Sequence, residues 1–110
     1  MKTFIINRKR WGKYALLNRD GKMCCLGFCS KSFGIPKEAL DNISIPLGIE
    51  NSKYKKLLPR WLLNSTSPGA EPSDVERLTG INDGDKPYSE KEELISKIFK
   101  KHHIIIKFVG

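Results

Sequence analysis

Runs of β-branched and aromatic residues stand close to both ends of the chain. Thr3 to Ile6 form the first run, and residues 104–109, IIIKFV, form the second. Such runs predict β-strands, and the almost continuous apolar character of the second predicts a mostly buried strand. We expect the first and last strands to share one sheet.

Residues 18–36 permit two interpretations. Residues 18–21, NRDG, are a turn signal, and this turn could close a hairpin with 22–26 as the return strand. The other interpretation is a helix over 24–33. There, four side chains recur at the three- and four-residue spacings of one helical face, namely Cys25, Leu26, Cys29 and Phe33. We favour the helix.

The end of this helix is also marked in the sequence. Gly34 fits the position after the last helical residue, and Pro36 follows two residues later. Gly27 lies inside the helix, where glycine costs about 1 kcal/mol relative to alanine. Its presence there predicts a close contact with another part of the chain.

The remaining pattern predicts a second main helix near the end. Before it we expect a helical turn at 37–42, irregular structure over 43–70 with a short helix after Pro59, a surface loop at 64–73, a short helix at 73–78 and a loop at 79–88. Ser89 and Glu92 then match the S-x-x-E pattern that begins helices. The apolar face of that helix is Leu94, Ile95, Ile98 and Phe99. The chain therefore predicts a small single α+β domain over residues 1–110, with a short sheet of the N- and C-terminal strands packed by two main helices.

The composition agrees with one soluble domain. Of 110 residues, 39% are hydrophobic and 29% charged, which suits a modest core with no separate second domain. No apolar run approaches the roughly 18 residues of a membrane span, and basic residues from Arg8 onward interrupt any secretory signal. We therefore expect a cytoplasmic protein without a membrane partner. Its three cysteines, clustered together, do not form a secreted disulfide framework.

Positive charge is concentrated in the first half of the chain. The net charge is +8; residues 1–60 hold 13 Lys or Arg against 4 Asp or Glu, whereas residues 61–110 hold 7 against 8. This balance favours a nucleic acid, a nucleotide or an acidic protein surface as partner. Arginine suits phosphate, and Trp11 could stack on a base or could instead anchor the core. The candidate anion-binding residues are Arg8, Lys9, Arg10, Trp11, Lys13 and Lys22.

The cysteines permit three interpretations, which are a metal site, a catalytic nucleophile and core packing. Adjacent side chains on a helix or strand point in different directions, so neither Cys24–Cys25 nor His102–His103 is a natural chelate, and we expect no metal site. A cysteine at a helix N-terminus could be a nucleophile, because the helix dipole stabilises its thiolate. Cysteines at helical spacing are otherwise small core residues.

The segments KMCCLGFCSKSFGIP and HHIIIKFVG resemble the cysteine helix and histidine strand of NlpC/P60-type papain-like hydrolases. That resemblance implies a hydrolase in which Cys24 or Cys25 attacks and His103 accepts the proton. The chain departs from the pattern because Leu26-Gly27 replaces the usual Ser-Gly pair. The pattern also needs a third polar residue on a strand beyond the histidine, but only seven residues follow His103 in this sequence.

A second resemblance covers most of the chain. Small proteins encoded by tailed phages show a similar order of short motifs, which here are Gly12-Lys13-Tyr14, Cys24-Cys25-Leu26-Gly27, Leu58-Pro59 with Trp61, and Asn82-Asp83 before a closing helix. The resemblance implies a phage accessory protein and brings no catalytic residue with it. We expect Asn82 and Asp83 to shape a turn or a cap through side-chain hydrogen bonds.

These patterns favour a non-enzymatic phage accessory protein that binds or inhibits a host factor, in counter-defence or host takeover. Its partner would be a host protein, a nucleotide or a nucleic acid with an anionic surface, and we expect no cofactor. The alternative is a cysteine hydrolase that uses Cys24 or Cys25 with His103. The sequence leaves the oligomeric state open.

Overall fold

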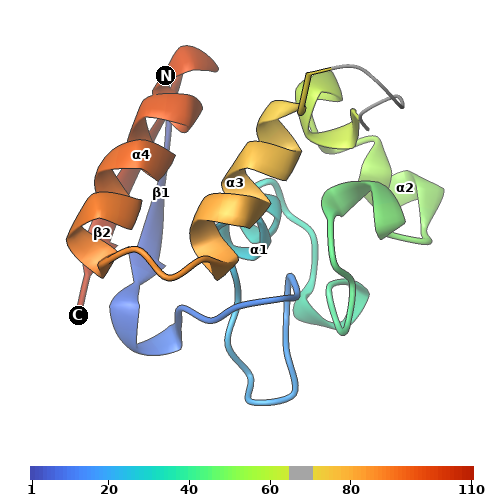
Figure 1. Ribbon diagram of the computed structural model, residues 1–110. Helices are drawn as coiled ribbons and strands as arrows, with labels where there is room; N and C mark the ends of the chain where they lie inside the picture. Colours follow the sequence, from blue (N-terminus) through green and yellow to red (C-terminus); the bar gives the residue numbers. More distant parts are fainter. Residues whose placement is uncertain (65–70) are drawn as a thin grey trace.

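Two parallel strands pair the first and the last segments of the chain, so the two termini lie at opposite ends of the sheet (Figure 1). Strand β1 (Lys2–Asn7) pairs with β2 (Ile104–Val109) in a register that sets Lys2 opposite Ile104. Successive side chains of a strand point to opposite faces, and Phe4 and Ile6 of β1 accordingly point into the core. The predicted sheet of first and last strands is confirmed.

The expectation that the second strand is mostly buried is wrong. Ile104 is buried, but Ile105 and Val109 are exposed and the remaining residues are exposed or half-buried. The reason is that helices cover one face of the two-stranded sheet, so every second side chain of β2 faces solvent.

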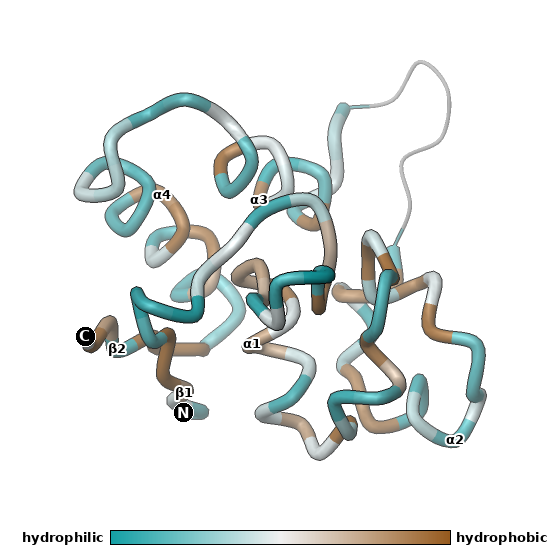
Figure 2. The backbone as a smooth tube through the Cα atoms, turned by 90° about the horizontal axis from the view of Figure 1, so that it is seen from below, coloured by the Kyte–Doolittle hydropathy of each residue, from teal (hydrophilic) through white to brown (hydrophobic). Residues whose placement is uncertain are grey.

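The structure is a computed structural model that describes residues 1–64 and 71–110. Its helices are α1 (Cys25–Ser32), α2 (Ser52–Lys55), α3 (Asp74–Asp83) and α4 (Tyr88–Lys101), with 3₁₀ turns η1 (Arg8–Arg10), η2 (Lys37–Ala39), η3 (Pro46–Gly48) and η4 (Arg60–Leu63). In Figures 1 and 2, α1 lies in the middle, with the sheet and α4 on one side and α2 on the other. The radius of gyration, 12.9 Å, is that of one domain of this length. Most of the loop expected at 64–73 lies outside the described residues.

Helix α1 confirms the helical interpretation of the cysteine segment. It begins after Cys24, and Gly34 follows its end in the left-handed region, with φ of 99°. A Cβ atom on Gly27 would overlap the carbonyl group of Leu16, so the predicted close contact is also confirmed. The hairpin does not form, because Met23 pairs in parallel with Trp11.

Helix α3 is longer than the sequence indicated. The helix expected at 73–78 continues to Asp83, so the loop expected at 79–88 is wrong over 79–83. Gly80 and the polar residues around it are poor helix formers, but Asn82 is held there by contacts with distant parts of the chain, described below. The start is better predicted, since the Ser73 side chain accepts a hydrogen bond from the amide of Glu76.

Helix α4 begins two residues earlier than expected and without the S-x-x-E cap. Pro87 occupies the capping position, and its carbonyl accepts a hydrogen bond from the amide of Lys91. Ser89 therefore lies inside the first turn, and the capping box is wrong. The predicted apolar face is present, with Ile95 and Phe99 fully buried.

Candidate anion-binding surface

A buried asparagine at the end of α3 organises this part of the molecule. The side-chain oxygen of Asn82 accepts hydrogen bonds from the indole N–H of Trp11 at 2.6 Å and from the amide of Cys25 at 3.0 Å. Its side-chain nitrogen donates to the carbonyl of Gly12 and to a carboxylate oxygen of Asp83, both at 2.9 Å. All four hydrogen-bonding positions of the amide are thus filled. We call these five residues the Asn82 network.

The Asn82 network also begins helix α1. The residue before that helix, Cys24, makes no side-chain cap, although helix starts favour Ser, Thr, Asp or Asn there. Asn82 supplies the missing acceptor to the amide of Cys25 from 57 positions along the chain. The expectation that Asn82 forms a cap is confirmed, but the helix it caps is distant in sequence.

A buried lysine that the sequence analysis missed supports this network. Lys91 is 2% exposed, and its ammonium group donates to the backbone carbonyl of Asn82 at 2.9 Å. Burial, together with the nearby charge of Lys13, lowers the pKa of Lys91. The available signal was its position one helical turn before Ile95, on the apolar face of α4.

The structure gives no support for an activated cysteine. Cys24, Cys25 and Cys29 are all buried with free thiols. Burial raises the pKa of Cys24 to about 11 and also raises the pKa values of Cys25 and Cys29, outweighing backbone amides that favour the Cys24 thiolate. Because the thiolate is the nucleophile, burial and raised pKa values make these thiols poorly suited to nucleophilic attack at neutral pH.

The candidate base lies away from these thiols. His103 precedes β2, and its carbonyl accepts a hydrogen bond from the amide of Lys2, at the start of β1. Cys24 instead follows Met23, which bridges to Trp11, and Trp11 packs on Phe108 near the end of β2. His103 precedes the first residue of that strand, and none of the hydrogen bonds among the described residues joins it to a cysteine side chain.

His102, the neighbour of His103, makes contacts within the fold. The ring of His102 stacks on that of Trp61, with centroids 3.8 Å apart, and its Nε2 lies 2.7 Å from a carboxylate oxygen of Asp74. Hydrogen bonds from His102 and Lys101 lower the pKa of Asp74, although partial burial works in the other direction. This contact ties the end of α4 to the start of α3.

A backbone bridge brings basic side chains from two segments together. Trp11 pairs with Met23, through bonds from the amide of Met23 to the carbonyl of Arg10 and from Gly12 to Met23. Trp11 and Met23 are buried, whereas their neighbours Arg10 and Lys22 are exposed. The segments touch closely, since a Cβ on Gly12 would lie 2.7 Å from that of Lys22.

We call Lys9, Arg10 and Lys22 the basic face. All three are exposed. Within residues 1–64 and 71–110, none of their side chains forms an ion pair. Their charges are therefore available to a partner.

The side chains of Arg8 and Lys13, two other candidate residues, bond to other parts of the protein. Arg8 forms a two-point ion pair with Glu92, with nitrogen–oxygen distances of 2.9 and 2.7 Å, and this hydrogen bonding raises the pKa of Arg8. Lys13 donates to the carbonyl of Gly84 at 3.2 Å. These side chains hold η1 and the following segment against α4 and the end of α3.

Trp11 cannot stack on a base in this structure. It is 5% exposed and packs between the rings of Tyr88 and Phe108, with its N–H on Asn82. The core-anchor interpretation of Trp11 is confirmed. An indole is large and mostly apolar, and burying it with its one donor satisfied favours this position.

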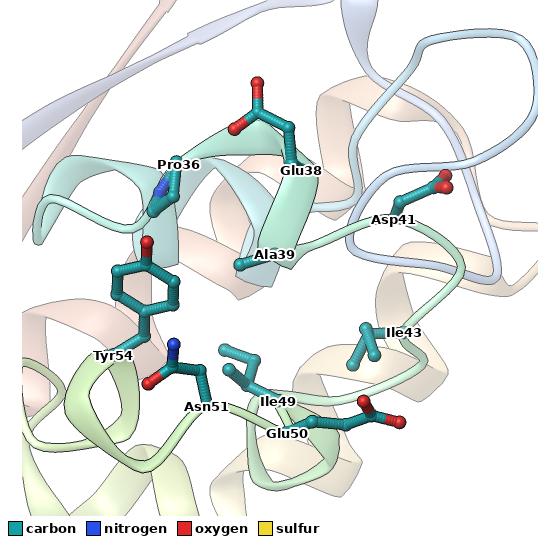
Figure 3. A pocket seen from close by; sticks show the side chains of 9 residues that line it. All are labelled: Pro36, Glu38, Ala39, Asp41, Ile43, Ile49, Glu50, Asn51 and Tyr54. Carbon is teal, nitrogen blue, oxygen red and sulfur yellow. The ribbon is translucent and has the colours of Figure 1, made fainter.

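A pocket lined in part by acidic residues lies elsewhere on the molecule. It has a volume of about 430 Å³ and is lined by Pro36, Glu38, Ala39, Asp41, Ile43, Ile49, Glu50, Asn51 and Tyr54. Figure 3 shows the carboxylates of Glu38 and Asp41 turned away from Ala39 and Ile49 at its centre. Across the described parts of the chain, no three or more His, Cys, Asp or Glu residues are grouped to hold a metal ion. The pocket therefore provides neither a metal centre nor a site for an anion.

Comparisons with known proteins add no relative. No protein-family model, no curated protein and no solved structure matches the chain. None of the helices in the described residues has both the length and the apolar character needed to span a bilayer. The two family resemblances drawn from the sequence remain predictions.

Proposed function

We propose that this protein is a non-enzymatic binding protein that holds an anionic partner on its basic face. The observation that supports this best is the bridge between Trp11 and Met23, which joins the two backbone segments that carry the exposed cations Arg10 and Lys22. Exposed cations that form no ion pair within the described residues attract phosphate or carboxylate groups without first breaking such a pair. The burial of Cys24 and Cys25 favours binding over hydrolysis.

The biological setting follows from the resemblance to small tailed-phage proteins. On that basis the protein acts in the host cytoplasm and binds or inhibits a host factor during infection, in counter-defence or host takeover. The partner is a nucleotide, a nucleic acid or an acidic protein surface.

The test is charge reversal on the basic face, with heparin as the polyanionic probe. The triple variant Lys9→Glu, Arg10→Glu, Lys22→Glu should elute from immobilised heparin at much lower salt than the unmodified protein. Its thermal unfolding should stay nearly unchanged, since surface substitutions usually alter stability by about 0.5 kcal/mol or less. Arg8 and Lys13 are left in place because they hold neighbouring elements together.

A matched control separates a specific face from overall charge. Lys37, Lys53 and Lys56 are exposed on another part of the chain, and changing all three to glutamate alters the net charge equally. This control should retain most of the heparin binding. If it elutes as early as the basic-face variant, net charge alone explains binding and the assignment fails.

A further inference from the structure

A ladder of aromatic rings includes Trp11, which follows Arg10 in the chain. The ring of Tyr88 lies 5.1 Å from that of Trp11, and Trp11 lies 5.5 Å from Phe108. The guanidinium of Arg8 lies 5.8 Å from the centroid of Phe108 and completes the ladder. Trp11 in the middle is buried, whereas Tyr88 at one end is 55% exposed. The exposed ring of Tyr88 therefore packs directly against Trp11.

A second tyrosine is exposed through a strained backbone. Tyr14 is 72% exposed and has φ of 73°, a conformation that is strained for a bulky residue. Its amide donates to the Asp83 carboxylate at 3.0 Å, and the carbonyl of Gly12 accepts from Asn82 nearby. The Asn82 network therefore maintains a conformation that leaves the ring of Tyr14 in solvent.

Hydrogen bonds connect the two tyrosines. The Asp83 carboxylate accepts from the amide of Tyr14 and from the side chain of Asn82, and the carbonyl of Asn82 accepts from the ammonium of Lys91. The ammonium of Lys91 in turn lies 5.1 Å from the ring centroid of Tyr88. Asp83 and Asp85 offset the charge around Lys91, so phosphate groups are left to the basic face.

We propose that Tyr14 and Tyr88 are stacking platforms and that the partner is a single-stranded nucleic acid. This inference rests on the proposed function and adds bases to the phosphates that the basic face would hold. Single strands present unpaired bases, and proteins that bind them combine a cationic track with exposed aromatic rings. An acidic protein surface would need the cations alone and would leave the strain at Tyr14 without a role.

The experiment compares two strands of equal phosphate number. Binding of a labelled oligothymidine strand and of an abasic strand of the same length is measured by fluorescence anisotropy at one salt concentration. The unmodified protein should prefer the base-bearing strand. Tyr14→Ala and Tyr88→Ala should each reduce that preference roughly five- to a hundredfold, the usual range for loss of one stacking contact, with abasic affinity unchanged.

Two further variants guard against trivial explanations. Tyr88→Leu keeps an apolar side chain against Trp11 but removes the stacking ring, and it should behave like Tyr88→Ala. Leu57→Ala truncates an exposed apolar side chain elsewhere and should leave the preference intact.

Each outcome separates this inference from the proposed function. Equal affinity of the unmodified protein for both strands overturns the stacking platforms and favours an acidic protein partner. Abasic binding that survives reversal of Lys9, Arg10 and Lys22 overturns the proposed function instead, whatever the tyrosine variants do.

Discussion

The two sides of the Trp11–Met23 bridge differ in how their polar groups are treated. On the inner side, Asn82 fills every hydrogen-bonding position of its amide and buries the indole N–H of Trp11. On the outer side, Arg10 and Lys22 are exposed and form no ion pair within residues 1–64 and 71–110. The backbone around the Trp11–Met23 bridge thus carries both buried residues that stabilise the fold and exposed residues that can bind a partner.

This difference has an energetic basis. A buried donor or acceptor that loses its partner costs about 1–3 kcal/mol, because water cannot replace the lost bond. An exposed cation keeps its hydration when its neighbours change, and its substitution has little effect on stability. Variants on the two sides should therefore fail in different assays: unfolding for the inner side and partner binding for the outer side.

The largest expected effect compares two helical glycines. Gly27→Ala would force a methyl group into the carbonyl of Leu16, beside the start of α1. We expect a loss of at least about 3 kcal/mol in the free energy of unfolding, or no folding, as for severe overpacking. Gly80→Ala in α3 meets no atom within 4 Å and should stabilise the protein by up to about 1 kcal/mol.

Urea denaturation of both variants, with the unmodified protein alongside, provides the measurement. A Gly27→Ala protein as stable as the unmodified one would show that α1 can shift away from Leu16. The inner side of the bridge would then be less tightly packed than its contacts indicate.

The next effect tests the Asn82 network itself. Asn82→Leu removes the oxygen that accepts from Trp11 and Cys25 and introduces an apolar side chain of similar size. Two stranded donors predict a loss of about 2–5 kcal/mol, measured by thermal or urea unfolding. Asn64→Leu, at an exposed asparagine, is the control and should change stability by about 0.5 kcal/mol or less. A loss below about 1 kcal/mol for Asn82→Leu would contradict the role given to this residue.

The smallest effect appears only in alkaline solution. Burial raises the pKa of Cys24 from 9.0 to about 11, so between these values the unfolded chain releases a proton that the folded chain keeps. Stability should therefore fall as pH rises through this window, by about 1.4 kcal/mol per pH unit for this thiol. Below it, the contribution of Cys24 is fully present.

Comparing the unmodified protein with Cys24→Ala isolates that contribution. The variant should be less stable by a constant amount between pH 6 and 8, and its stability should then decline less steeply with rising pH. Parallel pH profiles for the two proteins would show that Cys24 titrates alike in both states and is accessible to water.

What the sequence predicted well depends on neighbours in the chain. The strand at 104–109, the cysteine helix and the apolar face of α4 all follow from short periodic patterns. Asn82 could be predicted as a capping residue from its type, but its actual partner, Cys25, is 57 positions away and only the folded chain identifies it.

The errors also have physical causes. Lys91 sits on an apolar face because a backbone carbonyl can accept its charge, an arrangement that no composition rule favours. Ser89 is a good capping residue, yet Pro87 already supplies an extended residue and a carbonyl for the first turn. Trp11 suited both a stacking surface and a core, and the indole bond to Asn82 decided between them.

The pairing of β1 with β2 has a consequence for synthesis on the ribosome. Lys2 is made before its partner Ile104, and every helix in the described residues is made between them. Until β2 is made, β1 has no strand beside it, and closing so long a loop slows folding. The sheet of the nascent chain is therefore completed only after β2 has left the exit tunnel.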